Sequence, residues 1–137
     1  MAFWILKSEP TDYPFAKLQK EKKAAWTGIR NYTARNNLRA MKKGDLALFF
    51  HTGKDKAVVG IAKLLAEAYP DPTAKGEDFS AIDIGPVKSL VEPVPLATLK
   101  AQAATKEMSI VRQGRLSAGA ATAAEWKAVL ELGATKL

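Results

Sequence analysis

The segment WTGIRNYTARNNLR, residues 26–39, gathers side chains that suit a flat and negatively charged ligand. Trp26 offers an indole ring on which a nucleobase can stack, at about 1–3 kcal/mol for each stacked base. Gly28 beside it would let a ligand approach the backbone closely. The alternative for Trp26 is ordinary core packing, because most tryptophan side chains are largely buried.

The three arginines of this segment are candidates for phosphate binding. Arg35 and Arg39 stand four residues apart, so they share one face of a predicted helix and repel each other slightly. No acidic residue lies between them, which favours a face that meets phosphates. A plainly solvated face is the alternative. Arg30 stands at the helix entrance, where free backbone N–H groups also favour an anion.

Two further polar groups stand near the predicted strand and helix ends. Asn31 carries an amide that can pair with a base edge, but a helix N-cap explains it more simply. Residues 7–9, Lys-Ser-Glu, follow the apolar stretch FWIL directly. Polar groups in such a place need partners, which the segment 26–39 or a ligand would supply.

Catalytic and metal chemistry find little support in the sequence. The chain has no cysteine and a single histidine, His51, and the serines lie outside any GxSxG motif. No GxGxxG or phosphate-loop motif occurs, so we expect no cofactor, no metal and no catalytic residue. His51 ends an apolar strand just before a turn. It is either a half-exposed histidine bonded to a loop or a polar group at a pocket rim.

Composition indicates one domain, residues 1–137, with a net charge of +7 that favours polyanionic partners. Hydrophobic residues make up 47% of the chain and charged ones 26%, as in a typical globular protein. The apolar run before Lys7 is too short for a signal peptide or a membrane span. We therefore expect a cytoplasmic protein that does not bind membranes.

The hydrophobic pattern predicts short strands and helices that position these groups. Strands are expected at 3–7, 45–51, 57–69, 82–84, 87–94 and 115–118, and helices after Pro14, over 32–41, over 95–102 and from a Thr122–Glu125 capping box. Ala34, Leu38 and Met41 would form the buried stripe of the second helix, which Gly44 would end in the left-handed conformation. Because strands and helices do not alternate regularly, a mainly antiparallel barrel or curled sheet with inserted helices is predicted.

The chain resembles the EVE domain along nearly its whole length. The resemblance lies in KSEP (7–10), WTGIRNYTARNNLR (26–39), GDLALFFH (44–51), VVGIA (58–62), AYPDPTA (68–74) and RLS (115–117). This family belongs to the PUA-like superfamily, with YTH and ASCH domains. The resemblance implies an α+β fold, a mixed, mainly antiparallel pseudo-barrel of about five or six strands with short helices around it. It also implies a non-enzymatic module that flips a modified base, chiefly modified cytosine in DNA, into an aromatic pocket.

The resemblance also assigns residues to the site. It places Trp26 as the stacking wall of the base pocket, together with Ser8, Arg30, Asn31, Phe50 and His51. Phosphates would be held by Lys7, Arg35 and Arg39, and the pocket rim would include Tyr32, Tyr69 and Asp71. The expected partner is modified DNA bound by a monomer. The alternatives are an RNA-binding module with the same basic face and, third, a small hydrolase that uses His51 and Glu9.

Overall fold

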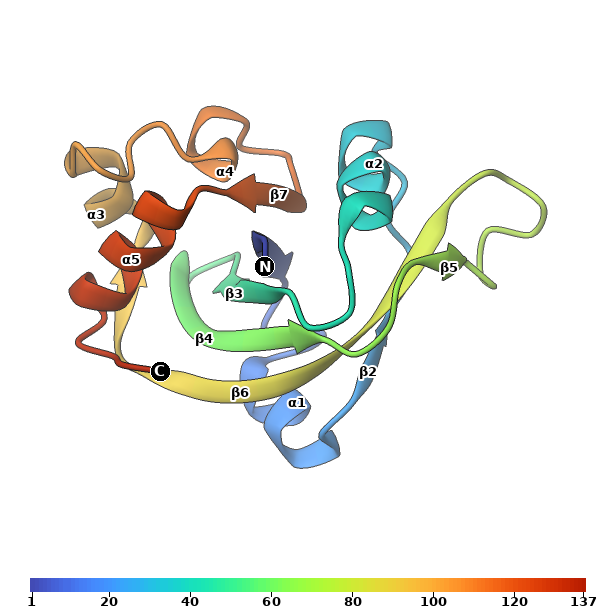
Figure 1. Cartoon of the computed structure of the whole chain (residues 1–137), viewed down its shortest axis with the longest axis horizontal. Helices are drawn as coiled ribbons and strands as arrows, with labels where there is room; N and C mark the ends of the chain where they lie inside the picture. Colours follow the sequence, from blue (N-terminus) through green and yellow to red (C-terminus); the bar gives the residue numbers. More distant parts are fainter.

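The computed structural model describes residues 1–137 and contains one curled sheet with five short helices around it (Figure 1). The strands are β1 (Phe3–Ser8), β2 (Ala24–Trp26), β3 (Leu46–His51), β4 (Ala57–Leu64), β5 (Tyr69–Pro70), β6 (Ser80–Pro95) and β7 (Ala118–Ala121). The helices are α1 (Phe15–Glu21), α2 (Tyr32–Ala40), α3 (Leu96–Ala101), α4 (Ser109–Arg112) and α5 (Ala123–Leu132). None of these helices combines the length and the apolar character needed to span a membrane.

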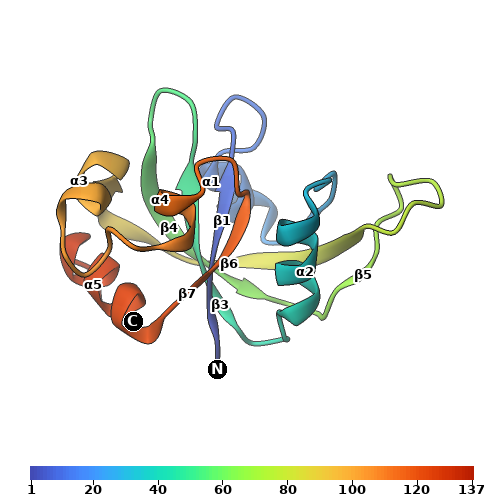
Figure 2. The same cartoon turned by 90° about the horizontal axis from the view of Figure 1, so that it is seen from above.

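The strands follow the order β2-β6-β4-β3-β1-β7, and β5 pairs with the first two residues of β6, Ser80 and Ala81. Only β1 and β3 are parallel; the other pairs are antiparallel. The long strand β6 bends across the whole molecule (Figures 1 and 2). Its register with β4 shifts at two points, which is how a long strand curves without breaking. The segments predicted at 82–84 and 87–94 are therefore one strand, and the predicted mainly antiparallel α+β fold is confirmed.

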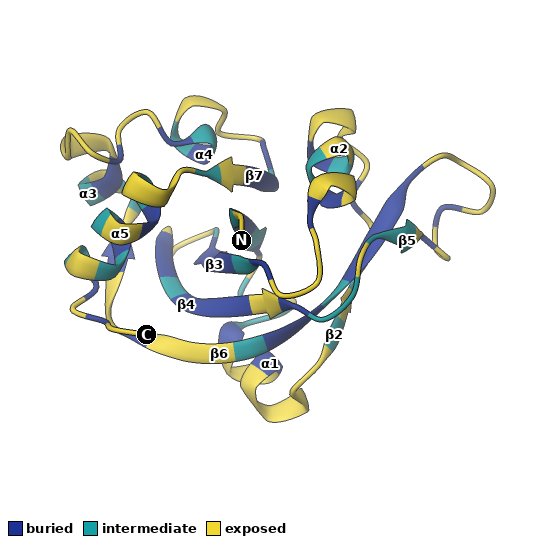
Figure 3. Cartoon of the chain, in the orientation of Figure 1, coloured by how far each residue is buried: buried dark blue, intermediate teal, exposed yellow.

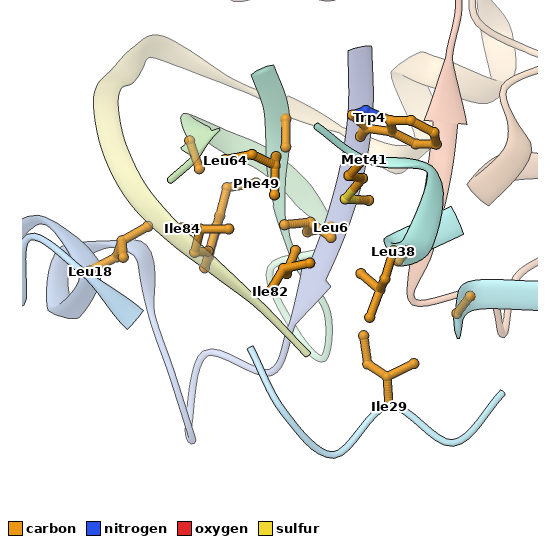
Figure 4. Packing of buried hydrophobic residues seen from close by; sticks show 14 of the residues in the cluster. Trp4, Leu6, Leu18, Ile29, Leu38, Met41, Phe49, Leu64, Ile82 and Ile84 are labelled. Carbon is orange, nitrogen blue, oxygen red and sulfur yellow. The ribbon is translucent and has the colours of Figure 1, made fainter. Parts of the chain in front are cut away.

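The alternation of side chains along β1 and β3 divides the core into two parts. Leu6 and Phe49 face the layer of α1 and α2, where they meet Leu18 and Leu38 (Figure 4). The side chains between them in sequence, such as Phe50, face α3, α4 and α5. Both faces of these strands are therefore buried, as the continuous apolar run of β3 predicts. Exposed residues gather on the outer faces of the helices and on the loop between β5 and β6 (Figure 3).

The helix signals in the sequence are confirmed in detail. The Asn31 side chain accepts a hydrogen bond from the backbone N–H of Ala34 at 2.9 Å and so caps α2. Thr122 and Glu125 form the predicted capping box at the start of α5. These signals are local, because the side chain and the backbone group that it satisfies lie within one turn.

Three boundaries differ from the prediction. The strand predicted over 57–69 ends at Leu64, and Tyr69–Pro70 forms the separate strand β5. Gly44 is left-handed, with φ of 92°, but α2 has already ended at Ala40, so this glycine belongs to the turn before β3. The last strand covers Ala118–Ala121 instead of 115–118. Its small residues carry no hydrophobic pattern, so only pairing with β1 defines it. The strand β2 and the helix α4 are too short to give a periodic signal, and neither was predicted.

Gly60 allows α1 to pack closely on β4, and this contact can be tested. A Cβ atom on Gly60 would lie 2.4 Å from the Cε2 atom of Phe15, inside the buried core. Gly60→Ala is therefore expected to lower the free energy of unfolding by about 1–3 kcal/mol through overpacking. Urea denaturation would measure the loss. Gly114→Ala is the control, since its added methyl group meets no atom within 4 Å; equal losses in the two variants would contradict the argument.

Candidate functional site

A cavity of about 390 Å³ opens where β1 and β2 end. This volume lies within the range of about 300–1,000 Å³ that is usual for small-molecule sites. The lining residues come from the end of β1, the connection to α1, the β2–α2 connection and the residue before β7: Lys7, Ser8, Glu9, Tyr13, Ala25, Trp26, Thr27, Gly28, Ile29, Arg30 and Ser117. The pairing of β1 with β7 (Figure 2) is what brings Ser117 beside residues more than a hundred positions earlier.

Trp26 forms the aromatic wall of this cavity. It is the last residue of β2 and pairs with Ile82 of β6, so its backbone is fixed by the sheet. Its ring meets two other rings edge to face: Phe49, with 5.6 Å between the ring centres, and Tyr13, with 5.5 Å and an angle of 89° between the Tyr13 and Trp26 rings. Edge-to-face pairs of this kind add about 0.5–1.5 kcal/mol each beyond buried area. The half-buried indole is thus held in one orientation, with part of its surface open to the cavity.

The connection that follows Trp26 is held by a buried carboxylate. The Asp71 side chain is completely buried and accepts hydrogen bonds from Gly28 N at 2.8 Å and Arg30 Nη1 at 3.1 Å. Its other oxygen accepts from the N–H and the hydroxyl of Thr73, at 2.7 and 2.6 Å. Gly28 has φ of 83°, the left-handed conformation that glycine adopts without strain. Asp71 thereby ties the cavity wall to the loop after β5.

The pKa of Asp71 reflects these contacts. Burial alone would raise the pKa of this carboxyl group, because it disfavours the charged form. The hydrogen bonds from Thr73, Gly28 and Arg30 outweigh burial and lower the pKa from 3.8 to about 2. Asp71 is therefore ionised at neutral pH and balances the charge of Arg30.

The end of β1 supplies a hydroxyl to the cavity and holds a cation on the other face of the sheet, beside Phe50. Ser8 Oγ donates a hydrogen bond to the carbonyl of Tyr13, which ties the two cavity walls together. Lys7 Nζ donates to the carbonyl of Gly114 at 2.7 Å and lies 5.8 Å from the centre of the Phe50 ring. Burial lowers the pKa of Lys7, and no carboxylate is paired with it.

Four residues assigned from the sequence line the cavity together, namely Lys7, Ser8, Trp26 and Arg30. Phe50 does not. It is buried on the opposite face of the sheet, against the layer of α3, α4 and α5. Side chains alternate along β3, so only one of two adjacent phenylalanines can face the cavity side. That residue is Phe49, which supports Trp26 from behind.

His51 also lies outside the cavity lining. Its Nε2 accepts a hydrogen bond from the backbone N–H of Phe15 at 3.0 Å, which satisfies a free donor at the start of α1. Its Nδ1 lies 3.1 Å from Asp55 Oδ2. With Nε2 as acceptor, Nδ1 carries the proton and donates it to Asp55. The ring thus links three segments and has no free nitrogen for a ligand.

The remaining pocket and rim assignments also take other places. Asn31 is the cap of α2, and Tyr32 is 64% exposed and stacks on Phe79. Tyr69 donates a hydrogen bond to Asp83 at 2.7 Å, which together with burial raises its pKa to about 12. None of these residues lines the cavity. Asp71 does not line it either, but it holds Gly28 and Arg30 of the cavity wall through hydrogen bonds that the sequence does not reveal.

Arg35 and Arg39 hold α2 to the loop before β6. Both guanidinium groups contact Asp78, and Arg39 also donates to the hydroxyl of Ser80 at 2.8 Å. Arg39 lines a second cavity of about 380 Å³, together with Asp78 and two glutamates, Glu67 and Glu77. Three carboxylates there would repel a phosphate. The structure therefore corrects the expectation of an unpaired basic face on α2, because the acidic partner is distant in sequence.

Sequence reasoning missed Tyr13 and Ser117, and gave Thr27 and Ile29 no role. Tyr13 lines the cavity, and its hydroxyl donates to Glu21 at 2.7 Å; burial and this bond raise its pKa to about 12. The available signal was an aromatic residue shortly after residues 7–9. Ser117 belongs to the segment RLS (115–117) that carries the EVE resemblance, but only the β1–β7 pairing places it at the cavity. No cluster of three or more His, Asp or Glu side chains suited to a metal ion is present.

Comparison with known proteins gives consistent matches over nearly the whole chain. Mouse (Mus musculus) thymocyte nuclear protein 1 is 35% identical over 168 residues, which cover 98% of this chain and 74% of that protein. The structure of protein Atu2648 from Agrobacterium tumefaciens is 38% identical with a TM-score of 0.94, and covers 98% of this chain and 94% of that one.

A structure of human THYN1 protein in complex with 5-methylcytosine containing DNA is 31% identical, with a TM-score of 0.90 and complete coverage of both chains. The YTH domain of Zygosaccharomyces rouxii MRB1, in complex with N6-methyladenosine RNA, shares 15% identity and a TM-score of 0.62, covering 99% of this chain and 88% of that one. That likeness concerns the fold alone. The model of the EVE domain matches residues 2–132, and the chain therefore belongs to the EVE domain family.

Proposed function

We propose that this protein binds nucleic acid without a chemical step and holds a modified nucleobase, modified cytosine in DNA first, against Trp26. The observation that carries the proposal is the indole itself, fixed by two other rings and open to a cavity large enough for a base. Extruding a base costs a few kcal/mol, and stacking inside a pocket offsets much of that cost. The DNA complex of the related human protein supports the choice of ligand.

The cavity also offers polar groups at its walls. The lining includes the hydroxyl residues Ser8 and Ser117 and the carboxylate residue Glu9. The Glu9 carboxylate accepts a hydrogen bond from Thr52 at 3.0 Å and would have to turn from it to accept one from the amino group of cytosine. Lys7 adds a cation that no carboxylate pairs with, whereas the charge of Arg30 is balanced by Asp71. A base with an amino group, attached to a phosphate backbone, fits this combination of groups.

The contacts of His51 support binding without a chemical step. Both of its ring nitrogens are engaged by the protein, so neither is free to act as an acid or a base toward a ligand.

Fluorescence anisotropy with matched oligonucleotides tests this function. The DNAs would carry cytosine, 5-methylcytosine or 5-hydroxymethylcytosine at one position, with an RNA of the same sequence as a further arm. We expect one modified DNA to bind more tightly than the unmodified DNA at two salt concentrations. Equal affinity for all of them would contradict base recognition, and tighter binding of the RNA would favour an RNA-binding module instead.

A further inference from the structure

The segment Gly114–Ser117, between α4 and β7, reaches the cavity through Ser117. Leu116 is buried in the core and Ser117 lines the cavity. Lys7 binds this segment twice: its backbone N–H donates to Ser117 O at 2.9 Å, and its Nζ donates to Gly114 O at 2.7 Å. Arg115 lies between these two fixed points, so its backbone is held beside the cavity mouth.

Arg115 differs from the other arginines around the site. It is exposed and makes no hydrogen bond, ion pair or ring contact. Arg30 is tied to Asp71 and Thr73, and the two arginines of α2 are tied to Asp78. An arginine kept free of carboxylates, at a place where the backbone is fixed, is suited to bind an external anion, since its planar fork matches phosphate oxygens.

Lys7 supplies a second cation next to Arg115, at the Gly114 carbonyl and on the Phe50 face of the sheet. Its ammonium group has three N–H donors, of which the Gly114 carbonyl takes one. No carboxylate neutralises it, and partial burial disfavours its charge. An anion bound beside the Lys7 ammonium group would stabilise its charged form and so offset the cost of partial burial.

We propose that Arg115 and Lys7 together bind a backbone phosphate that flanks the nucleotide, outside the cavity and beside the α4–β7 connection, so that this connection, and not α2, is the phosphate-binding surface. This inference rests on the proposed function for the position of the nucleotide. Phosphate contacts fix register and orientation and carry no base information. Arg115 should therefore contribute equally to modified and unmodified DNA.

The test compares the salt dependence of DNA binding for Arg115→Ala, Arg112→Ala and Arg35→Ala. Arg112 is the matched control, three residues away on α4, 67% exposed and paired only with Glu107 at 3.6 Å. For Arg115→Ala we expect affinity to fall about three- to tenfold near 0.1 M salt, with the slope of log K against log salt reduced by about 0.7–0.9. The preference for the modified base should stay unchanged, and the two other variants should change little.

Three results would overturn the inference. Arg115→Ala and Arg112→Ala could show the same loss of DNA affinity and the same change in the slope of log K against log salt. The effect would then come from the net charge of the protein and not from a phosphate contact of Arg115. Arg35→Ala could show the larger change in slope, which would return the phosphate-binding surface to α2. Arg115→Ala could lose base preference without a change in slope, which would make Arg115 a base-reading residue. Because the slope is measured on unmodified DNA as well, the comparison remains decisive even if the wild-type protein shows no base preference.

Discussion

Trp26→Ala is expected to remove the preference for modified DNA and to weaken binding of the preferred DNA by roughly five- to 150-fold. This range corresponds to the loss of one stacked base, about 1–3 kcal/mol. The loss should be specific to the base, because Trp26 lines the cavity and carries no charge. Unmodified DNA held by phosphate contacts alone should lose much less affinity. Anisotropy titrations with modified and unmodified DNA in parallel would measure both effects.

Two variants control this experiment. Trp26→Phe keeps an aromatic ring at the wall and should retain part of the preference. Tyr32→Ala removes an aromatic side chain that is 64% exposed and lies outside the cavity lining, and it should leave the preference intact. Trp26 also packs against the core, so thermal unfolding should confirm that each variant is folded. A Trp26→Ala protein that still prefers the modified base would refute the stacking wall.

Asp71→Asn is expected to destabilise the fold by about 2–4 kcal/mol and to weaken ligand binding, although Asp71 does not line the cavity. Each carboxylate oxygen of Asp71 accepts two hydrogen bonds, from Gly28 and Arg30 on one side and from Thr73 on the other. The amide NH₂ of asparagine would face donors in either orientation. Buried groups left without partners in this way are costly, most of all next to a charge.

Urea denaturation of Asp71→Asn and Asp78→Asn separates this effect from a surface ion pair. Asp78 also contacts two arginines, but its side chain is 79% exposed, so solvent screens the interaction. A much smaller loss is therefore expected for Asp78→Asn. If the two variants were equally destabilised, burial of Asp71 would not be the reason for its importance.

Acid should remove the contribution of Asp71 in a defined pH range. Its pKa is lowered from 3.8 to about 2 in the folded protein, so the unfolded chain binds the proton more readily. The stabilisation is fully present above about pH 4 and is lost as the pH falls from about 4 to about 2. The difference in unfolding free energy between wild type and Asp71→Asn should narrow over that range. A difference that stays constant down to pH 2 would contradict the role of the charged form.

The elements that the sequence predicted well are those defined by local chemistry. Asn31 caps α2 and the capping box begins α5, because each signal lies within one helical turn. The buried strand β3 was predicted from its continuous apolar run. Boundaries failed where small residues gave no pattern, as in Ala118–Ala121, or where an element was only three or four residues long, as in β2 and α4.

For the candidate site, the sequence determined which residue types are available, and the EVE resemblance indicated that Trp26, Ser8 and Arg30 belong together. Only the tertiary structure decided which face each side chain occupies. Alternation along β3 sends Phe49 and not Phe50 to the cavity side. Pairing of β1 with β7 brings Ser117 to the cavity, and the loop after β5 brings Asp71 behind its wall.

The arginines show the same division most clearly. A helix face with Arg35 and Arg39 predicts a basic surface when only neighbouring residues are considered. In the folded chain both side chains meet Asp78, about forty positions away, whereas Arg115, which the local pattern did not single out, has no partner. The sequence therefore fixes the number of charges and their local spacing. Whether a charge is paired or free depends on long-range contacts, which form only when the sheet curls and brings distant segments together.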